Sequence, residues 1–474
     1  MPQYLSPGVY VEEVPASMKP IAGVSTSTAG FVGIVPDIVN ISGGAVTNEN
    51  VGVGNGNKTV FNLSSYPVVT DASSFQVRVK GAPMAATLSN DDAKKVSQVT
   101  FSTAPASGSP AGNNVITVDY IPTPAFTVAP AAEVHLCTTF SDYRKFFGDF
   151  STDAGQRNLT HAVYGFFNNG GTRCYVVRAA AAGGIAAALA NFETIDEIAI
   201  VAAPGVVDAN TQSLLITHCA QLTQDRFAIL DSPALVETTG ALDLTLFDPA
   251  NAKSVMPPFT DYGAVYFPWI QVFDPATQFV NPAGDGMQFV APSGHVAGIY
   301  ARVDTVRGVH KAPANETILG ALGLRYNLSK AQQDGLNPSG VNCIRSLNGN
   351  IRVWGARTVG GNANADLKYI NVRRTLLFIR ESIDEGTQWV VFEPNTGALW
   401  AKIVRNVTAF LLNVWRDGAL FGDTPDQAFY VKCDAELNPP EVRDLGQVIT
   451  EIGVSIVRPA EFVIFRISQW TAPS

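Results

Sequence analysis

The sequence predicts a multidomain protein of the α+β (mixed α/β) class, from its composition and from a change of pattern along the chain. It has 474 residues, of which 46% are hydrophobic and only 15% charged, with 41 glycines and 29 prolines spread throughout. A chain of this length holds about two to four domains. Few charges and many turn-forming residues favour strands and loops over helical bundles.

The first 40 residues contain a short extended run at residues 4–14, which begins around Pro7-Gly8. Its side chains alternate, as in a strand. Val9 and Val11 fall on one face, and Tyr10, Glu12 and Val14 fall on the other.

Residues 41–128 differ from their surroundings because they are rich in Gly, Asn, Ser, Thr, Ala and Pro. Short alternating runs at residues 59–63, 75–80, 96–102 and 115–120 predict strands. Several short strands separated by turn residues indicate a small β-sandwich. We expect an inserted, β-rich decoration module.

Residues 131–320 alternate between helical and apolar extended patterns, which predicts a middle α/β domain whose sheet is covered by helices. The expected helices are residues 140–147, 156–167, 211–222 and 293–305. The expected strands are residues 172–178, 198–202, 226–230 and an aromatic run at 263–273.

Residues 321–454 predict a second core, with strands at 351–354 and 390–392 and a long helix between Asn395-Thr396 and Gly418. A further helix at residues 366–382 has four basic side chains on or near one face, namely Lys368, Arg373, Arg374 and Arg380. They form either an ordinary solvated face or a ridge that docks on an acidic partner.

The C-terminal end predicts a helix followed by a strand. Asn438 is a candidate N-cap before Pro439-Pro440, and Val442, Leu445, Ile449 and Ile452 recur at helical spacing. After Gly453 the period changes to two, and the strand comprises Phe462, Val463, Ile464, Phe465 and Ile467. This strand belongs to a C-terminal arm, residues 455–474, and it has open edges. It inserts into its own fold or is donated to the sheet of another chain.

The sequence offers no catalytic, cofactor or metal motif. The run GVGNGNKT at residues 52–59 has Asn57 where a phosphate-binding loop requires Gly before Lys, and the five cysteines form no CxxC pair. We therefore expect no cofactor, no metal site and no enzymatic activity.

The net charge and the hydropathy of the chain argue against two further classes of protein, nucleic-acid binders and membrane-spanning proteins. The net charge of −9 argues against a general nucleic-acid binder. No apolar run approaches the roughly 20 residues needed to span a bilayer, and no signal peptide is visible, so we expect synthesis and assembly in the cytoplasm without membrane insertion.

Several segments together resemble the contractile tail sheath family of bacteriophages and phage-tail-like injection systems. They are YLSPGVYVEEV (4–14), PIAGVSTS (20–27), FVG (31–33), NGGTRCYVVR (169–178), APSGHVAGIYARVD (291–304), YINVRRTLLFIRESI (369–383) and the stretch from 392 to the terminal strand. The module at residues 41–128 lies outside the shared family core and resembles the β-rich insertions that decorate some sheaths.

The resemblance implies that residues 1–40 join residues 321–454 in an inner domain and that both chain ends donate strands to neighbouring subunits. It implies a helical homo-oligomer of stacked rings around an inner tube, with baseplate and terminal cap proteins as further partners. The particle would be a virion tail or an injection machine, released or docked at a membrane. The basic ridge would face the tube.

Two alternatives come from other classes. A non-contractile β-rich surface adhesin would account for the module at 41–128 but not for two adhesive chain ends. An α/β enzyme would account for residues 131–320 but lacks a recognisable set of catalytic residues.

Overall fold

The computed structural model describes residues 20–41, 45–72, 74–108, 110, 112–123, 125–281 and 283–466. The chain divides into two compact units. Unit 1 comprises Met1–Val24 and Phe378–Val457, and unit 2 comprises Ser25–Leu377 and Arg458–Ser474.

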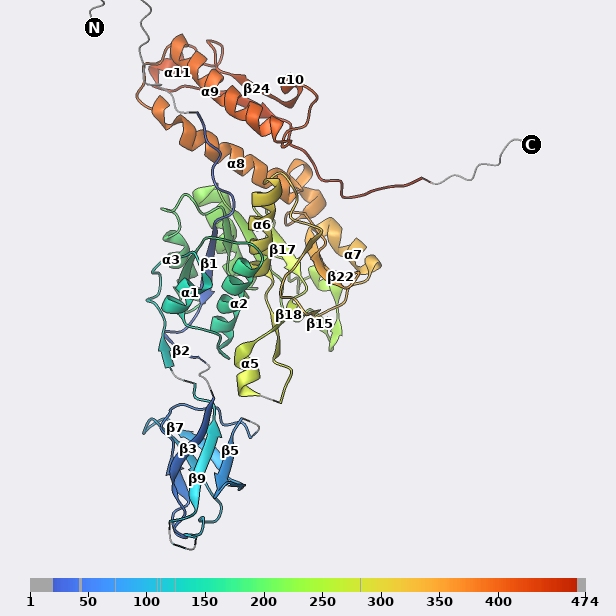
Figure 1. Cartoon of the computed structure of the whole chain (residues 1–474). Helices are drawn as coiled ribbons and strands as arrows, with labels where there is room; N and C mark the ends of the chain where they lie inside the picture. Colours follow the sequence, from blue (N-terminus) through green and yellow to red (C-terminus); the bar gives the residue numbers. More distant parts are fainter. Residues whose placement is uncertain are drawn as a thin grey trace, which may run out of the picture. The chain divides into compact units, whose positions relative to one another are not determined.

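Unit 2 contains a nine-stranded sheet in the order β11-β12-β1-β13-β14-β17-β22-β23-β20 (Figure 1). The bounds are β11 His135–Cys137, β12 Cys174–Ala179, β1 Ala29–Ile34, β13 Ile200–Ala202, β14 Phe227–Asp231, β17 Gly263–Phe267, β22 Val341–Leu347, β23 Asn350–Val353 and β20 Glu316–Thr317. The strands from β12 to β22 pair in parallel, whereas β11, β23 and β20 pair antiparallel to their neighbours. Strands such as β17 are apolar and buried throughout, because a parallel sheet is covered on both faces.

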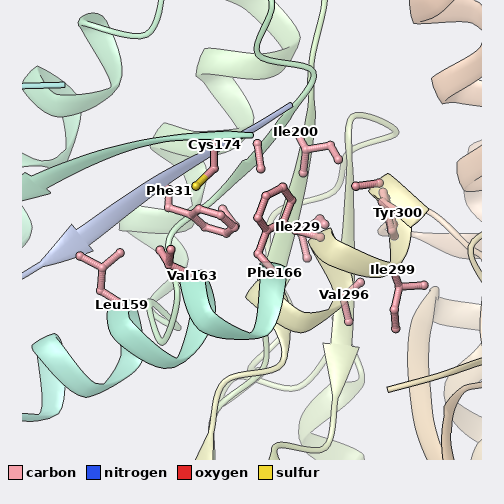
Figure 2. Packing of buried hydrophobic residues seen from close by; sticks show 14 of the residues in the cluster. Phe31, Leu159, Val163, Phe166, Cys174, Ile200, Ile229, Val296, Ile299 and Tyr300 are labelled. Atoms are coloured by element: carbon pink, nitrogen blue, oxygen red, sulfur yellow. The ribbon is translucent and has the colours of Figure 1, made fainter. Parts of the chain in front are cut away.

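Helices cover this sheet and form two hydrophobic cores. In β1, Phe31 belongs to the first core and Val32 to the second, since successive side chains point to opposite faces. The first core includes residues of α2 (Ala154–Asn168) and α6 (Ser293–Arg307), and the second includes residues of α3 (Ile185–Ala190) and α4 (Ala209–Thr217). Figure 2 shows Phe31 beside Phe166 of α2, and their ring centroids are 5.5 Å apart.

Glycine permits the close contact of α2 and α6. A Cβ atom at Gly294 of α6 would lie 2.2 Å from Cα of Ala162 in α2, a distance at which one helix would have to move. The N-terminus of α2 is capped by Asp153, which accepts a hydrogen bond from the backbone N–H of Gln156.

The inserted module comprises two antiparallel sheets around one core. The first has the order β3-β9-β5-β6 and the second β4-β8-β7. Their bounds are β3 Val46–Val53, β9 Val115–Tyr120, β5 Gln76–Val79, β6 Ala82–Pro83, β4 Val60–Asn62, β8 Val96–Thr100 and β7 Thr87–Asp91. Both sheets contribute to a shared cluster that includes Phe61, Val99 and Val118. Two sheets that share one core have the arrangement of a small β-sandwich.

The core of unit 1 lies along α9 (Gly397–Arg416), whose buried residues include Leu399, Ile403 and Phe410. The rest of the unit comprises the later turns of α8 (Ile370–Thr387), α10 (Pro425–Ala428), β24 (Phe429–Lys432), α11 (Pro440–Asp444) and β25 (Glu451–Val454). Residues 20–24 pack here too, because Ile21 belongs to this core and the backbone N–H of Val24 donates to Oγ of Ser382 at 3.1 Å.

Most predicted elements of the middle of the chain are confirmed. The helix at 140–147 is α1 (Phe140–Phe147), and the helices at 156–167 and 293–305 are α2 and α6. The aromatic run at 263–273 forms two strands, β17 and β18 (Ile270–Phe273), in different sheets. Pro268 lies between them, and it has no backbone N–H to donate to a continuing ladder.

Two predicted elements near the C-terminus are wrong. Residues 390–392 form no strand, because a 3₁₀ turn occupies Gln388–Val390 and Phe392 has a φ of +67°. The terminal helix ends at Asp444, and Ile452 lies in β25 instead. The side chain of Asn438 does not cap the helix. It binds the backbone N–H and C=O of Ile449, at 2.7 and 3.0 Å.

The predicted boundaries of the inner domain also need correction. The family resemblance groups residues 1–40 with residues 321–454, yet β1 and β22 both lie in the nine-stranded sheet of unit 2. The unit boundaries fall after Val24 and after Leu377. β1 lies in unit 2 because it pairs with β12 and β13, which lie far along the chain. The hydrophobic pattern of the sequence does not report such pairing.

Candidate functional site

The sequence singles out three elements, two terminal strands and a basic ridge. The N-terminal strand residues Val9, Tyr10, Val11, Glu12 and Val14 lie outside the described residues, as does Ile467. The structure therefore reports on the C-terminal segment up to Arg466 and on the ridge.

The C-terminal segment exposes four consecutive apolar side chains. Phe462, Val463, Ile464 and Phe465 are 70%, 69%, 77% and 84% exposed, and none of them belongs to a strand. Figure 1 draws this segment as a coil. A run of this kind is unfavourable in water, and exposed apolar runs are typical of interaction sites.

Glu461, directly before this run, is fixed by three side chains. Its carboxylate accepts two hydrogen bonds from Arg357, Nε to Oε1 and Nη2 to Oε2, both at 2.8 Å. Nδ2 of Asn337 donates to Oε1 and the hydroxyl of Tyr369 donates to Oε2, each also at 2.8 Å. We call Glu461 with Arg357, Asn337 and Tyr369 the Glu461 anchor.

Electrostatics keep the Glu461 anchor charged. Burial alone would raise the pKa of Glu461, but the hydrogen bonds from Arg357, Asn337 and Tyr369 outweigh burial and hold the pKa below its ordinary value. A carboxylate with a lowered folded-state pKa contributes stability above its unfolded pKa and loses it as pH falls through the folded pKa. The ion pair with Arg357 is therefore present at neutral pH.

Unit 1 contains a sheet of only two strands, β24 and β25, which pair antiparallel with each other. Among the described strands neither has a second partner, so each keeps one open edge. A sheet of two strands is marginally stable alone and its open edges can accept further strands.

The prediction of one exposed basic ridge is wrong for Arg373 and Arg374. Arg374 pairs with Asp304 at 2.6 Å, and both side chains are only 3% exposed. Arg373 pairs with Asp261, and its guanidinium lies 3.9 Å from the ring centroid of Tyr262. Ion pairs within unit 2 neutralise these two charges.

Lys368 and Arg380 remain candidates for an ionic contact. Lys368 is partly buried with its Nζ 4.8 Å from the ring centroid of Tyr369, and Arg380 is exposed on α8. Their role in binding an inner tube stays a prediction.

The pair of Arg374 and Asp304 joins three segments of unit 2. Arg374 donates to both carboxylate oxygens and to the carbonyl oxygen of Thr26, whose own hydroxyl donates to Asp304. Burial would lower the pKa of Arg374, but the Asp304 carboxylate outweighs it and the pKa lies above its ordinary value. The contact is structural, since it ties residue 26, α6 and α8 together.

The described part of the chain contains no group of three or more His, Cys, Asp or Glu side chains placed to hold a metal ion. None of its helices combines the length and apolar character needed to cross a membrane.

Comparison with known families decides the classification. Residues 178–359 match the model of the phage tail sheath protein central domain, and residues 362–469 match the model of the phage tail sheath C-terminal domain. Together these matches cover more than half of the chain. The chain belongs to the phage tail sheath protein family.

This member of the phage tail sheath family is 27% identical over 270 residues to the tail sheath protein of Burkholderia phage BcepMu. The alignment covers 55% of this chain and 53% of the relative, so it spans about half the length of that protein.

Two solved structures share the fold of this tail sheath protein at 22% identity. One belongs to the baseplate of the anti-feeding prophage, with a TM-score of 0.62, covering 99% of this chain and 100% of that chain. The other belongs to the PVC sheath complex of an extracellular contractile injection system in its contracted state, with a TM-score of 0.63 and 99% coverage of both chains.

The sequence did not reveal the Glu461 anchor or the open-edged sheet of this tail sheath protein. Arg357 lies 104 residues from Glu461 along the chain, so no local spacing reports their contact. The sequence shows one sign of the Glu461 anchor, namely an acidic residue directly before an apolar run.

Proposed function

We propose that the chain is the structural subunit of a contractile sheath, which polymerises helically around an inner tube and contracts to drive that tube through a target envelope. This proposal rests on the exposed run Phe462–Phe465, which lies in the part of the chain that matches the tail sheath C-terminal domain. The run extends away from the fold and packs against no other described part of it. An exposed apolar segment is best explained by burial in a neighbouring subunit.

The joint between subunits is proposed to be a shared sheet. The C-terminal residues Phe462, Val463, Ile464, Phe465 and Ile467 pair with an open edge of β24–β25 in a neighbouring copy. The N-terminal residues Val9 to Val14 pair in the same way. Backbone hydrogen bonds hold such a joint, while the side-chain contacts around it can slide and repack.

The assembly uses head-to-tail contacts that do not close, which produce a helix. Contraction draws on free energy stored in a metastable extended packing, so it needs no nucleotide, metal or enzymatic step. Assembly takes place in the bacterial cytoplasm, on a baseplate and up to a terminal cap, as part of a virion tail or a phage-tail-like injection particle. The module at 41–128 decorates the outside.

Electron microscopy of the purified chain tests this function. We expect hollow helical tubes whose width fits a sheath in the contracted state. A chain that stays monomeric at all concentrations that support assembly of other sheaths would contradict the proposal.

Contact with the inner tube is proposed to be weak and ionic, through Lys368 and Arg380. Raising the salt concentration from about 0.1 M to 1 M shortens the screening length from about 10 Å to 3 Å, so the tube should dissociate more readily from the sheath. The measurement is the fraction of tube that sediments with sheath. Lys368→Glu with Arg380→Glu should weaken binding already at low salt, whereas Lys94→Glu in the inserted module serves as the control. Binding that is indifferent to salt would refute the ionic contact.

A further inference from the structure

The Glu461 anchor lies at the root of the exposed apolar run. Residues up to Val457 belong to unit 1, and residues from Arg458 onward belong to unit 2. Glu461 is the last residue before Phe462, and its carboxylate is held by side chains that lie 92 to 124 residues away along the chain. The exposed run therefore begins at a fixed point on unit 2.

Arg357 is held in place without help from Glu461. Its Nη1 donates to the carbonyl oxygen of Asn337 at 2.9 Å and to Oδ1 of Asn362 at 3.1 Å, and its backbone N–H donates to Oδ1 of Asn342 at 2.8 Å. The guanidinium is a preorganised receptor, and a bidentate pair with a carboxylate also fixes orientation.

A second ion pair on the same segment provides a contrast. Arg458 pairs with Asp366 at 2.8 Å, but these side chains are 58% and 88% exposed. The side chains of Arg357 and Glu461 are only 4% and 19% exposed. Water screens the exposed pair, so the anchor holds the segment and the Arg458 pair contributes little.

We propose that Glu461 is a positioning residue for subunit joining, since it fixes the root of the segment that is donated to the neighbour. This inference rests on the strand donation proposed above. Loss of the anchor would add residues 458–461 to the free chain, about 13 Å of extra length. A strand that moves freely meets its acceptor edge at a lower effective concentration than a strand whose first residue is held in place.

The test compares Glu461→Ala and Glu461→Gln with the full-length wild-type chain. The first readout is chymotrypsin cleavage after Phe462 in the unassembled chain, followed by mass spectrometry of the large fragment that ends at Phe462. Cleavage tracks the population in which the segment is open, so we expect it to be about 10-fold faster in Glu461→Ala and intermediate in Glu461→Gln. Arg458→Gln is the matched control and should stay within about 2-fold of wild type.

The second readout is the rate of tube assembly, followed by light scattering at equal protein concentration. We expect it to fall about 10-fold in Glu461→Ala, less in Glu461→Gln, and little in Arg458→Gln. Unchanged cleavage would show that there is no anchor, and faster cleavage with unchanged assembly would show that the anchor does not position the segment. Either result overturns the inference. Failure of strand donation itself has a different signature, because a chain that lacks residues 462–474 would then assemble as wild type does.

Discussion

A chain that lacks residues 462–474 should fold but should not form tubes. The deletion removes the four exposed apolar side chains and leaves Glu461 with its partners, so no buried contact of the described fold is lost. Because these side chains have no internal partner to lose, the free energy of unfolding should change by less than about 0.5 kcal/mol. Tube formation, observed by electron microscopy and sedimentation, should be abolished.

A length-matched variant separates loss of apolar side chains from loss of chain. Replacement of Phe462, Val463, Ile464 and Phe465 by serine should weaken assembly severely, because serine gives the donated strand nothing to bury. Val53→Ser is the control, since Val53 is an exposed apolar residue of the inserted module. Undiminished tube formation by the truncated chain would refute the donated strand.

The largest effect on stability is expected at the buried pair of Arg374 and Asp304. Asp304→Asn removes the charge that compensates a guanidinium whose side chain is only 3% exposed. Removing one partner of a buried ion pair costs about 3–5 kcal/mol, because the other charge stays buried without compensation. We expect the free energy of unfolding of Asp304→Asn to fall by this amount in urea titrations of the unassembled chain.

The control for this experiment is the pair of Arg78 and Asp119 in the inserted module, whose side chains are both 25% exposed. Asp119→Asn should cost less than about 1 kcal/mol, because solvent screens the pair. If Asp304→Asn were no more destabilising than Asp119→Asn, the buried pair would not be the tie between residue 26, α6 and α8 that its geometry indicates.

Local pattern was sufficient for the long helices and for the β-rich insert. The helical spacing of α2, α6 and α9 and the alternation in β5, β8 and β9 are properties of neighbouring residues, so the sequence displays them directly. The aromatic run at 263–273 shows the limit of such patterns, because Pro268 divides it between two sheets.

Contacts between remote residues account for what the sequence did not reveal. The sequence places Arg373 and Arg374 either on a solvated helix face or on a ridge that docks on a partner. In the structure Asp261 and Asp304, 112 and 70 residues away, hold them inside the fold. The helical spacing of Leu445, Ile449 and Ile452 is overridden as well. Gly446 has a φ of +72°, which ends the helix, and Asn438 holds the backbone of Ile449. Neither influence is visible as a period in the sequence.

We expect Phe462 to Ile467 to pair with the sheet of another subunit. The most direct measurement is a cryo-electron microscopy reconstruction of tubes assembled from the full-length chain, at a resolution that separates strands. We expect an edge of β24–β25 in each subunit to carry an added strand whose density connects to Glu461 of a neighbouring subunit. Density that returns residues 462–467 to their own subunit, or a β24–β25 sheet that stays two-stranded in the tube, would contradict this claim.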